Sequence, residues 1–189
     1  MDRAEMIKKL KPKLNEKRFI HSIGVEYTAA NLAFVHGVDV KKARIAGLLH
    51  DCAKCIPTEE KLKKAKKLGF NINKSEKANP DLLHGKLGAY LAKEKYGITD
   101  PDILSAITYH TTGHPGMNLL DKIIFIADYI EPNRKMIRDL PEIRREAYLD
   151  IDKCVIHILK NTLDYLDEGD TVIDELTQKT YDYYVNKEV

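Results

Sequence analysis

A histidine and an aspartate stand side by side in this sequence, His50 and Asp51, directly after an apolar run. Imidazole and carboxylate groups are seldom buried unless something pairs with them. The preceding residues 43–49 have the periodicity of a buried helix face, so both groups are expected in the interior. Neutral imidazole nitrogen and carboxylate oxygen both suit a divalent or trivalent metal cation. The pair is therefore a candidate metal ligand set, although the dipeptide alone is common.

Three further histidines and one aspartate share this setting, each on or at the end of an apolar helical segment: His21, His84, His110 and Asp128. A lone histidine on a helix is more often a hydrogen-bonded residue than a ligand, and a buried salt bridge would explain Asp128 alone. That interpretation needs a separate explanation for each of the six residues, whereas a metal centre explains all of them together. The sequence therefore predicts that the six side chains converge on metal ions.

Helical periodicity dominates the elements that must position these residues, and no alternating strand pattern is found. The segment 119–130 is apolar nearly all round, which predicts the central, most buried helix. Further helices are expected over 16–35, 40–54, 59–68, 80–97, 99–110, 141–166 and 170–184, with a short amphipathic helix within 1–14. Residues 70–79 are expected to form an irregular surface segment. No repeat or linker divides the chain, so we expect one all-α domain over 1–189.

Composition excludes several classes of protein. With 43% hydrophobic and 32% charged residues in 189, the chain has the composition of a soluble globular domain. A net charge of +2 gives no reason to expect a nucleic acid or membrane partner. Three cysteines, an odd number, argue against a disulfide framework and suit a reducing compartment. The longest apolar run, 123–127, is too short to span a bilayer, and no secretory signal is recognised. We expect a cytoplasmic protein.

The order of these residues resembles the HD-domain phosphohydrolase superfamily: a histidine on the first long helix, a His-Asp pair, two single histidines, then an aspartate. It is most similar to the di-iron branch, and within it to the YqeK-type family of bacterial symmetrical dinucleoside tetraphosphate hydrolases. The strings that carry the resemblance are KRFIHS (17–22), GLLHDCAK (47–54), HG (84–85), YHTTG (109–113) and ADYIEPNR (127–134). The resemblance covers nearly the whole chain and implies a single-domain, HD-type helical bundle with a central buried helix.

The resemblance also implies the ligand sets of two metal ions. The first set is His21, His50, Asp51 and Asp128, and the second is His84, His110 and a bridging Asp51. Iron is the expected metal, with manganese, cobalt and zinc as alternatives, because histidine–carboxylate sites accept all of them. A shared carboxylate keeps two cations about 3.5–4 Å apart, a separation that clamps the attacking and leaving oxygens of a displacement at phosphorus. The expected nucleophile is a hydroxide bound at this dinuclear site.

The implied activity is symmetrical cleavage of diadenosine tetraphosphate, a dinucleoside polyphosphate, into two ADP. The expected catalytic residues are Asp51, Lys54 and Arg134. The positively charged side chains of Lys54 and Arg134 are expected to stabilise charge at phosphorus. The expected substrate-binding residues are Arg18, His21, His84, His110, Thr111, Asp128, Arg134, Asp170 and Thr171. Residues 170–176 are expected to wall a nucleoside pocket, although this stretch matches the family more loosely. The sequence leaves the oligomeric state open, with a homodimer as one option.

Other functions fit parts of the pattern. The nearest alternative is an HD phosphohydrolase acting on an alarmone, a cyclic dinucleotide or a nucleotide monophosphate. A mixed-valent di-iron oxygenase would share six similar ligands, but it would not need cations beside the metals, and a non-catalytic nucleotide sensor would not need the intact ligand set. The residues left outside the site are His36 at a helix end, His114 as an outer-shell group at most, His157 without a partner, Cys52 and Cys55 in packing roles, and lysines 61–67 on a solvated face.

Overall fold

The computed structural model describes residues 1–169 and 173–187, and these confirm the all-α prediction, with no β-strand among them. Most of the helices begin at an Asp or Asn whose side chain accepts a hydrogen bond from a backbone N–H of the first turn. The elements are α1 (Arg3–Leu10), η1 (Lys11–Lys13), α2 (Glu16–Val35), α3 (Val40–Leu49), α4 (Thr58–Lys67), α5 (Lys74–Ala78), η2 (Pro80–Leu83), α6 (His84–Tyr96), α7 (Pro101–Tyr109), α8 (Leu119–Ile130), α9 (Leu140–Leu149), α10 (Ile151–Glu168) and α11 (Glu175–Lys187).

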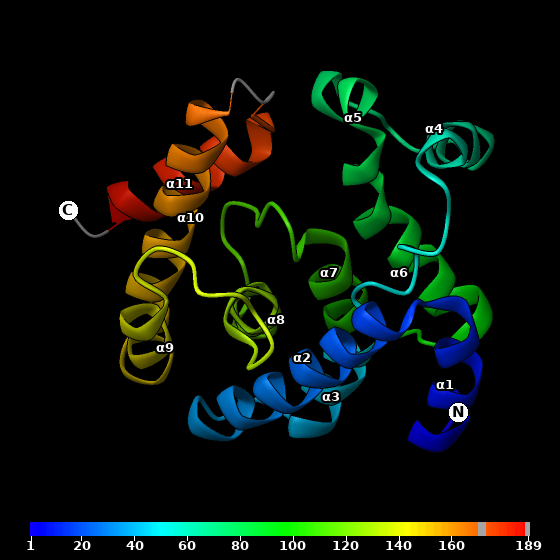
Figure 1. Ribbon diagram of the computed structural model, residues 1–189, viewed down its shortest axis with the longest axis horizontal. Helices are drawn as coiled ribbons and strands as arrows, with labels where there is room; N and C mark the ends of the chain where they lie inside the picture. The colour runs from blue at the N-terminus through cyan, green and yellow to red at the C-terminus, as the bar shows by residue number, and fades with distance from the viewer. Residues whose placement is uncertain (170–172, 188–189) are drawn as a thin grey trace.

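Helix α8 lies at the centre of the bundle, as its nearly continuous apolar sequence predicts. It begins after Asn118, whose side chain accepts a hydrogen bond from the Asp121 backbone, and it ends where Pro132 follows Glu131. Helices α2, α3, α7, α9 and α10 all contact it, and Figure 1 shows α8 end-on among them. Residues 120–127 are buried, so that only the first residue and the last turn of α8 reach the edge of the core.

The predicted helix boundaries are wrong in four places, one of which is the last helix, expected over 170–184 but observed as α11 at Glu175–Lys187. The helix expected over 40–54 ends at Leu49, because the next residues form tight turns, with Cys52 N–H donating to the Leu49 carbonyl at 3.0 Å. The helix expected over 141–166 is two helices, because Asp150 is extended (φ −150°, ψ 98°) and caps α10 through the Lys153 amide. The segment expected to be irregular, 70–79, contains α5, which starts with a capping box between Asn73 and Glu76.

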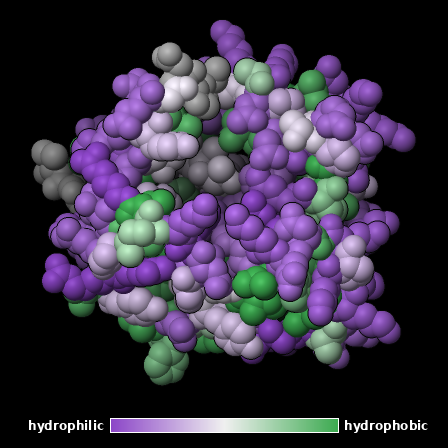
Figure 2. All heavy atoms as spheres, in the orientation of Figure 1, coloured by the Kyte–Doolittle hydropathy of each residue, from purple (hydrophilic) through white to green (hydrophobic). Residues whose placement is uncertain are grey.

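Two hydrophobic clusters fill the interior. The larger draws residues from α1–α3 and α6–α11, and the smaller joins Ala53, Ala65, Leu83 and Leu87 from the α3–α4 connection, α4, η2 and α6. The face shown in Figure 2 is mostly hydrophilic, with apolar side chains in small separate groups. None of the described helices has the length and apolar character needed to cross a bilayer. That the whole chain is one domain stays a prediction.

Two pairs of helices that carry metal-ligand candidates approach each other closely at glycines. A Cβ on Gly47 of α3 would lie 3.0 Å from the Val25 carbonyl oxygen of α2, and one on Gly85 of α6 would lie 2.3 Å from the Thr108 carbonyl oxygen of α7. Real Cβ atoms essentially never come as close to backbone as the contact at Gly85, and few come as close as the contact at Gly47, so a side chain at Gly85 would push its helices apart and one at Gly47 would crowd them. The absence of a side chain at Gly85 therefore allows His84 and His110 to meet.

We expect Gly85→Ala to lower the free energy of unfolding by about 1–3 kcal/mol, because its methyl group would overlap backbone that cannot move locally. It should also weaken metal binding, since α6 and α7 would separate. Urea denaturation and metal analysis measure the two effects. The matched control is Gly88→Ala on the same helix, where the nearest atom is a side-chain methyl of Ile107 at 3.1 Å, and the loss should be smaller. Equal stability of Gly85→Ala and wild type would contradict this interpretation.

Candidate metal centre

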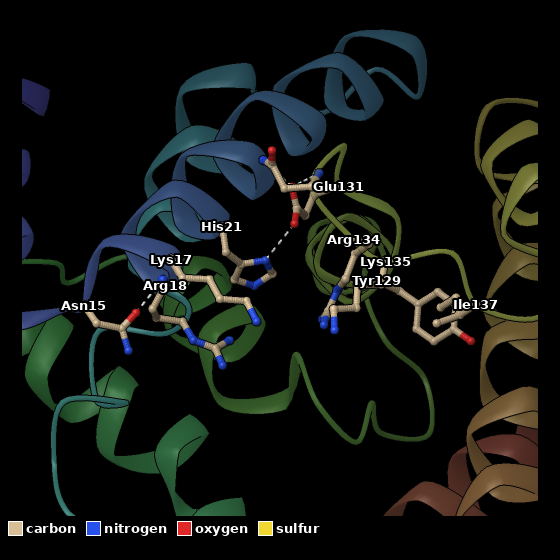
Figure 3. Close-up of a pocket in the computed structure, with 10 residues that line it drawn as sticks. Asn15, Lys17, Arg18, His21, Tyr129, Glu131, Arg134, Lys135 and Ile137 are labelled. Carbon is tan, nitrogen blue, oxygen red and sulfur yellow. Dashed lines mark hydrogen bonds and ion pairs between the residues drawn. The ribbon is translucent and has the colours of Figure 1, made fainter.

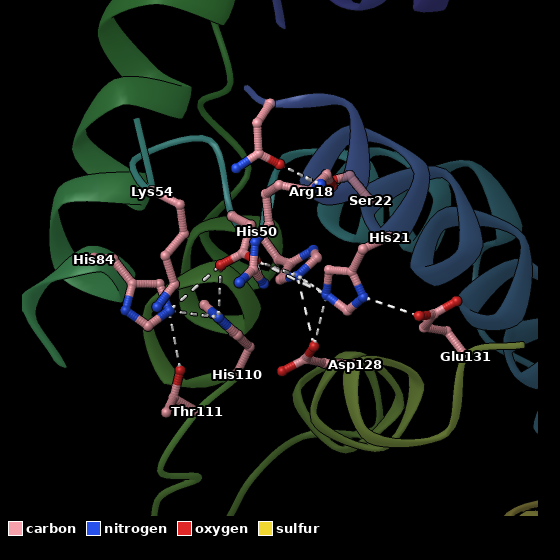
Figure 4. A network of polar contacts seen from close by, with 12 residues as sticks. Arg18, His21, Ser22, His50, Lys54, His84, His110, Thr111, Asp128 and Glu131 are labelled. Atoms are coloured by element: carbon pink, nitrogen blue, oxygen red, sulfur yellow. Dashed lines mark hydrogen bonds and ion pairs between the residues drawn. The ribbon is translucent and has the colours of Figure 1, made fainter. Parts of the chain in front are cut away.

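Helix termini deliver most of the side chains expected to bind metal. His50 and His110 are the C-cap residues of α3 and α7, and His84 is the first residue of α6. His21 lies in the second turn of α2 and Asp128 in the last turn of α8. Figure 4 shows these residues and Asp51, which follows His50, gathered in one network of polar contacts. The structure thus brings together all six residues that the sequence proposes as ligands.

Three of the histidines are oriented by the same local contact. His50, His84 and His110 each donate from Nδ1 to the backbone carbonyl three residues earlier, at 2.7, 2.6 and 2.8 Å. A carbonyl oxygen can only accept, so Nδ1 carries the proton in each ring and Nε2 of the neutral ring has a free lone pair. Each helix end therefore points one basic nitrogen toward the centre, which is the tautomer that a metal ligand needs.

These nitrogen lone pairs face one another at short range. Nε2 of His84 lies 3.0 Å from Nε2 of His110, and Nε2 of His50 lies 3.3 Å from Nε2 of His21. Two lone pairs without a shared proton repel, and the His84–His110 pair has no proton to share when both Nδ1 atoms are protonated. A cation between the nitrogens turns this repulsion into attraction, so the donor arrangement fits a metal ion at each pair.

Asp51 lies between the two histidine pairs and is buried, with 2% of its surface exposed. Its Oδ2 is 3.4 Å from His50 Nε2 and 3.8 Å from His21 Nε2. Its Oδ1 is 3.5 Å from His84 Nε2 and 3.7 Å from His110 Nε2, and this oxygen is buried with no hydrogen-bond partner. An unsatisfied buried carboxylate oxygen is costly. One oxygen facing each pair is the arrangement expected of a bridging carboxylate.

Asp128 completes the first group from the side of α8. Its Oδ1 lies 2.9 Å from His21 Nε2 and 3.8 Å from His50 Nε2. The potential ligand atoms fall into three overlapping sets within which every atom lies within 4.8 Å of the others: His21–His50–Asp51, His50–His110–Asp128 and Asp51–His84–His110. Because the sets share Asp51, His50 and His110, they form one continuous centre. The donor set of four imidazoles and two carboxylates is one that iron, manganese, cobalt and zinc all accept.

The protonation states of Asp51 and His84 favour cation binding at neutral pH, whereas that of His21 does not. Burial would raise the pKa of Asp51, but His50, His110 and His84 hold it well below its usual value of 3.8, so the carboxylate is ionised. Burial, together with the neighbouring His110, lowers the pKa of His84 to about 3, so its ring is neutral. For His21, burial is outweighed by hydrogen bonds to Asp128 and Glu131, which raise its pKa. Metal ligands must be deprotonated to bind, and His84 and Asp51 already are.

Each of the three basic side chains expected to contact phosphate is paired with a carboxylate, two with carboxylates of the centre and one with Asp81 beside it. Arg18 pairs with Asp51 at 2.7 Å, and Arg134 pairs with Asp128 at 2.8 Å. Lys54 pairs at 2.5 Å with Asp81, whose backbone carbonyl holds His84. These cations border the cluster of candidate ligands, as a role in phosphate binding requires. Their contact with substrate stays a prediction.

Of the remaining residues expected to contact substrate, only Thr111 lies in the described part of the chain. The Thr111 hydroxyl lies 3.2 Å from His84 Nε2, at the end of α7 that carries His110. Asp170 and Thr171 lie outside the described residues. Asp174, within the expected nucleoside wall 170–176, is 5% exposed and accepts hydrogen bonds from the Asn73 side chain and the Leu176 backbone. This contact holds the start of α11 against the segment that leads into α5.

Glu131 is a residue of the centre that the sequence did not single out. It is 1% exposed, and its carboxylate accepts a hydrogen bond from Nδ1 of His21 at 3.1 Å and another from the Asn133 backbone at 2.7 Å. A carboxylate behind a ligating histidine fixes its orientation and raises its basicity. Gly24 leaves the space for it, since a Cβ there would lie 2.2 Å from Glu131 Oε2. The available signal was a glutamate following Asp128 on the same apolar segment.

Lys61 is the second residue whose role was not anticipated, and its expected place on a solvated face is wrong. Its side chain is 2% exposed, and its Nζ lies 2.6 Å from Asp81 Oδ1. Asp81 therefore holds two ammonium groups, Lys54 and Lys61, while its carbonyl orients His84. Burial would raise the pKa of Asp81, but the two lysines hold it below its usual value. Lys61 would therefore keep Asp81 neutralised if Lys54 turned to another anion.

We expect Lys61→Met, which keeps the length of the side chain, to lower the free energy of unfolding by about 1–2 kcal/mol, because Asp81 is partly exposed. The stabilisation by an ionised Asp81 is full above its usual pKa of 3.8 and is lost as the pH falls toward the folded-state pKa. The difference between wild type and variant should therefore shrink in acid. Urea denaturation at pH 7 and pH 3 measures it, with exposed Lys63→Met as control. A constant difference would contradict the ion-pair explanation.

The other histidines lie outside the cluster of candidate ligands. His36 hydrogen-bonds the Ala147 carbonyl at 2.7 Å, and His114 contacts Asp121 at 3.0 Å. The expectation that His157 lacks a partner is wrong, because its Nδ1 lies 2.8 Å from Glu146. Cys52 and Cys55 are free thiols, and the expected packing role fits the buried Cys52 but is wrong for Cys55, which is exposed. None of these residues belongs to the ligand sets found among the described residues.

Comparison with known proteins gives concordant matches. A model of the HD domain matches residues 18–133. The symmetrical bis(5′-nucleosyl)-tetraphosphatase of Bacillus subtilis (strain 168) is 41% identical over 98% of this chain and 99% of its own. The protein of the same name from Staphylococcus aureus (strain NCTC 8325 / PS 47) is 38% identical over 92% of this chain and 90% of its own. The crystal structure of a predicted HD superfamily hydrolase involved in NAD metabolism from Clostridium acetobutylicum superimposes with a TM-score of 0.95, at 39% identity, covering 99% and 98% of the two chains.

Proposed function

The chain belongs to the HD-domain family, and on that premise we propose that it is a symmetrical bis(5′-nucleosyl)-tetraphosphatase, a metal-dependent phosphohydrolase. The substrate is diadenosine tetraphosphate and the product is two ADP. The observation that carries the proposal is Asp51, which lies between two pairs of inward-facing histidines with one oxygen toward each pair. This donor set suits two cations held side by side, the arrangement used for displacement at phosphorus.

The residues of the centre divide into two ligand sets on this proposal. His21, His50, Asp51 and Asp128 would hold one ion, and His84, His110 and Asp51 the other. Iron is the proposed metal, with manganese, cobalt and zinc as alternatives of the same ligand chemistry. When bound, the two ions would neutralise phosphate charge and lower the pKa of a coordinated water. Glu131 would keep His21 in the ligating orientation.

The basic side chains around the centre supply the positive charge that phosphate binding needs beyond that of the metal ions. In the structure Arg18, Arg134 and Lys54 each contact a carboxylate. Asp51 and Asp128 would be neutralised by metal, and Asp81 by Lys61, so that all three cations are available to phosphate oxygens. In the overall reaction the oxygen of one water joins a central phosphorus, and the bond from that phosphorus to the bridging oxygen breaks. The two protons of the water pass to the new terminal phosphates or to solvent.

The decisive experiment incubates the metal-loaded protein with diadenosine tetraphosphate and separates the products by chromatography. ADP as the only product supports the proposal. ATP with AMP would mean asymmetrical cleavage and would contradict it. If neither appears, the alternative of an HD phosphohydrolase for another nucleotide is tested in the same assay with an alarmone, a cyclic dinucleotide and nucleotide monophosphates. Hydrolysis of one of these, seen as phosphate, pyrophosphate, a nucleoside or a linear dinucleotide, would replace the proposal.

A further inference from the structure

A cavity of about 560 Å³ opens beside the metal centre on the side of His21. It lies between the start of α2, with Lys17 and Arg18, and the end of α8 with the following segment, including Tyr129, Arg134 and Lys135. Figure 3 shows the two walls facing each other across the space. The volume falls within the range of about 300–1,000 Å³ typical of small-molecule sites. We call this cavity the α2–α8 groove.

The charges that line the groove are mostly positive. Lys17, Arg18, Arg134 and Lys135 surround it, whereas its one carboxylate, Glu131, is buried and engaged by His21 and Asn133. Arg18 and Arg134 contact Asp51 and Asp128. Lys17 and Lys135 have no carboxylate partner among the described residues, and both are exposed. Two unpaired ammonium groups at the mouth of a cavity attract an anion with several negative charges.

The wall made by the segment after α8 also offers apolar surface. Tyr129 is half-buried, and Ile137 is 37% exposed. Figure 3 shows the two side chains next to each other at the end of the groove away from Lys17. An aromatic ring with an aliphatic neighbour is a surface on which a nucleobase or ribose can pack, and stacking of this kind tolerates any base. The groove therefore combines sites for phosphate and for a nucleoside.

The position of the groove along the metal centre indicates which part of a substrate it would take. Figure 4 shows His84 and Thr111 at one end of the centre and His21 with Glu131 at the other. Symmetrical cleavage places the central P–O–P bridge at the metals, so that two phosphates and a nucleoside extend from each end. The residues expected to wall one nucleoside, 170–176, include Asp174, which with Thr111 lines a separate small cavity at the His84–His110 end. The α2–α8 groove lies at the opposite end.

We propose that the α2–α8 groove binds the second nucleoside diphosphate half of the substrate, with Lys17 and Lys135 on its phosphates and Tyr129 and Ile137 against its nucleoside. This inference rests on the proposed function and adds a substrate specificity to it. The protein would bind both nucleoside ends of a dinucleoside substrate. It also explains why the bond is cut in the middle. The two halves of the substrate have equal length. Binding one half on each side of the metals therefore places the central P–O–P bridge at the metals, where it reacts.

The test is the double variant K17Q/K135Q, which removes both unpaired charges without touching a candidate ligand. KM for diadenosine tetraphosphate is expected to rise about tenfold, with metal content unchanged, because two phosphate contacts are lost. The matched control is K63Q/K66Q, which removes two exposed lysines of α4. The control should keep the wild-type KM. Equal KM values for the two double variants would overturn the proposal.

Binding of the product tests the groove independently of turnover. Titration calorimetry of the metal-loaded wild type with ADP is expected to show two sites per chain, and K17Q/K135Q should retain one of normal affinity. A single ADP site in both proteins would overturn the proposed role of the α2–α8 groove, even if the wild type cleaves diadenosine tetraphosphate to ADP. Two ADP sites with loss of one in the variant, but no cleavage of the dinucleotide, would retain the groove and reject the proposed reaction. The two proposals can therefore fail separately.

Discussion

Replacing Asp51 with asparagine is expected to remove both metal ions and to lower kcat/KM by at least about 10³-fold, since the metals supply several kcal/mol of transition-state stabilisation. Asparagine has the shape of aspartate but not its charge. It would present an amide group to one of the two histidine pairs, which both need an anionic oxygen. The loss of one side chain would thus disable both sites at once.

Metal analysis of the purified variant and ADP release from diadenosine tetraphosphate measure this effect. The matched control is Asp164→Asn, an exchange of the same kind at a partly exposed position on α10, which should leave metal and turnover at wild-type levels. Circular dichroism shows whether the Asp51 variant is folded. A folded Asp51→Asn protein that keeps two ions per chain would show that the carboxylate does not bridge them.

His84→Ala is expected to separate the two sites. Its Nε2 faces His110 and Oδ1 of Asp51, and it lies in none of the ligand sets that contain His21 or Asp128. We therefore expect the variant to lose one of two ions per chain and to keep the other. Turnover should fall by at least about 10²-fold, because a single ion cannot hold both the attacking and the leaving oxygen.

The measurement is metal stoichiometry at saturating metal, paired with kcat. The matched histidine control is His157→Ala. His157 lies on α10 and contacts Glu146 of α9, outside the ligand sets, so this variant should keep both ions. Loss of both ions from His84→Ala would indicate that the sites fill cooperatively. Retention of both would remove His84 from the ligand set and leave the lone pair of His110 unexplained.

The sequence predicts most of the fold where the signals are local. The bounds of α2 and α8 agree with the prediction, because Asn15 and Asn118 cap their first turns and Gly37 and Pro132 follow their ends. The break between α9 and α10 was missed because the apolar period continues through Asp150. Only the structure shows that the Asp150 side chain is used as a cap there.

The residues of the candidate site could likewise be predicted where the sequence signal is local, but not where a role depends on contacts between distant segments. The six proposed ligands share a pattern that can be read along the chain, an imidazole or carboxylate beside apolar residues. Lys61 has no such pattern, and Glu131, although it ends an apolar segment, has a role that depends, like that of Lys61, on contacts with distant segments, Glu131 with His21 and Lys61 with Asp81. Lys61 in particular belongs to a run of lysines that looks uniformly solvated, and only the packing of α4 on η2 buries it.

The most direct test of the two-ion account is a crystal structure of the metal-loaded protein with anomalous diffraction data collected at the absorption edge of the bound metal. The account predicts two anomalous peaks on either side of Asp51, one contacted by His21, His50 and Asp128 and the other by His84 and His110. A single peak, or two peaks without Asp51 between them, would contradict it.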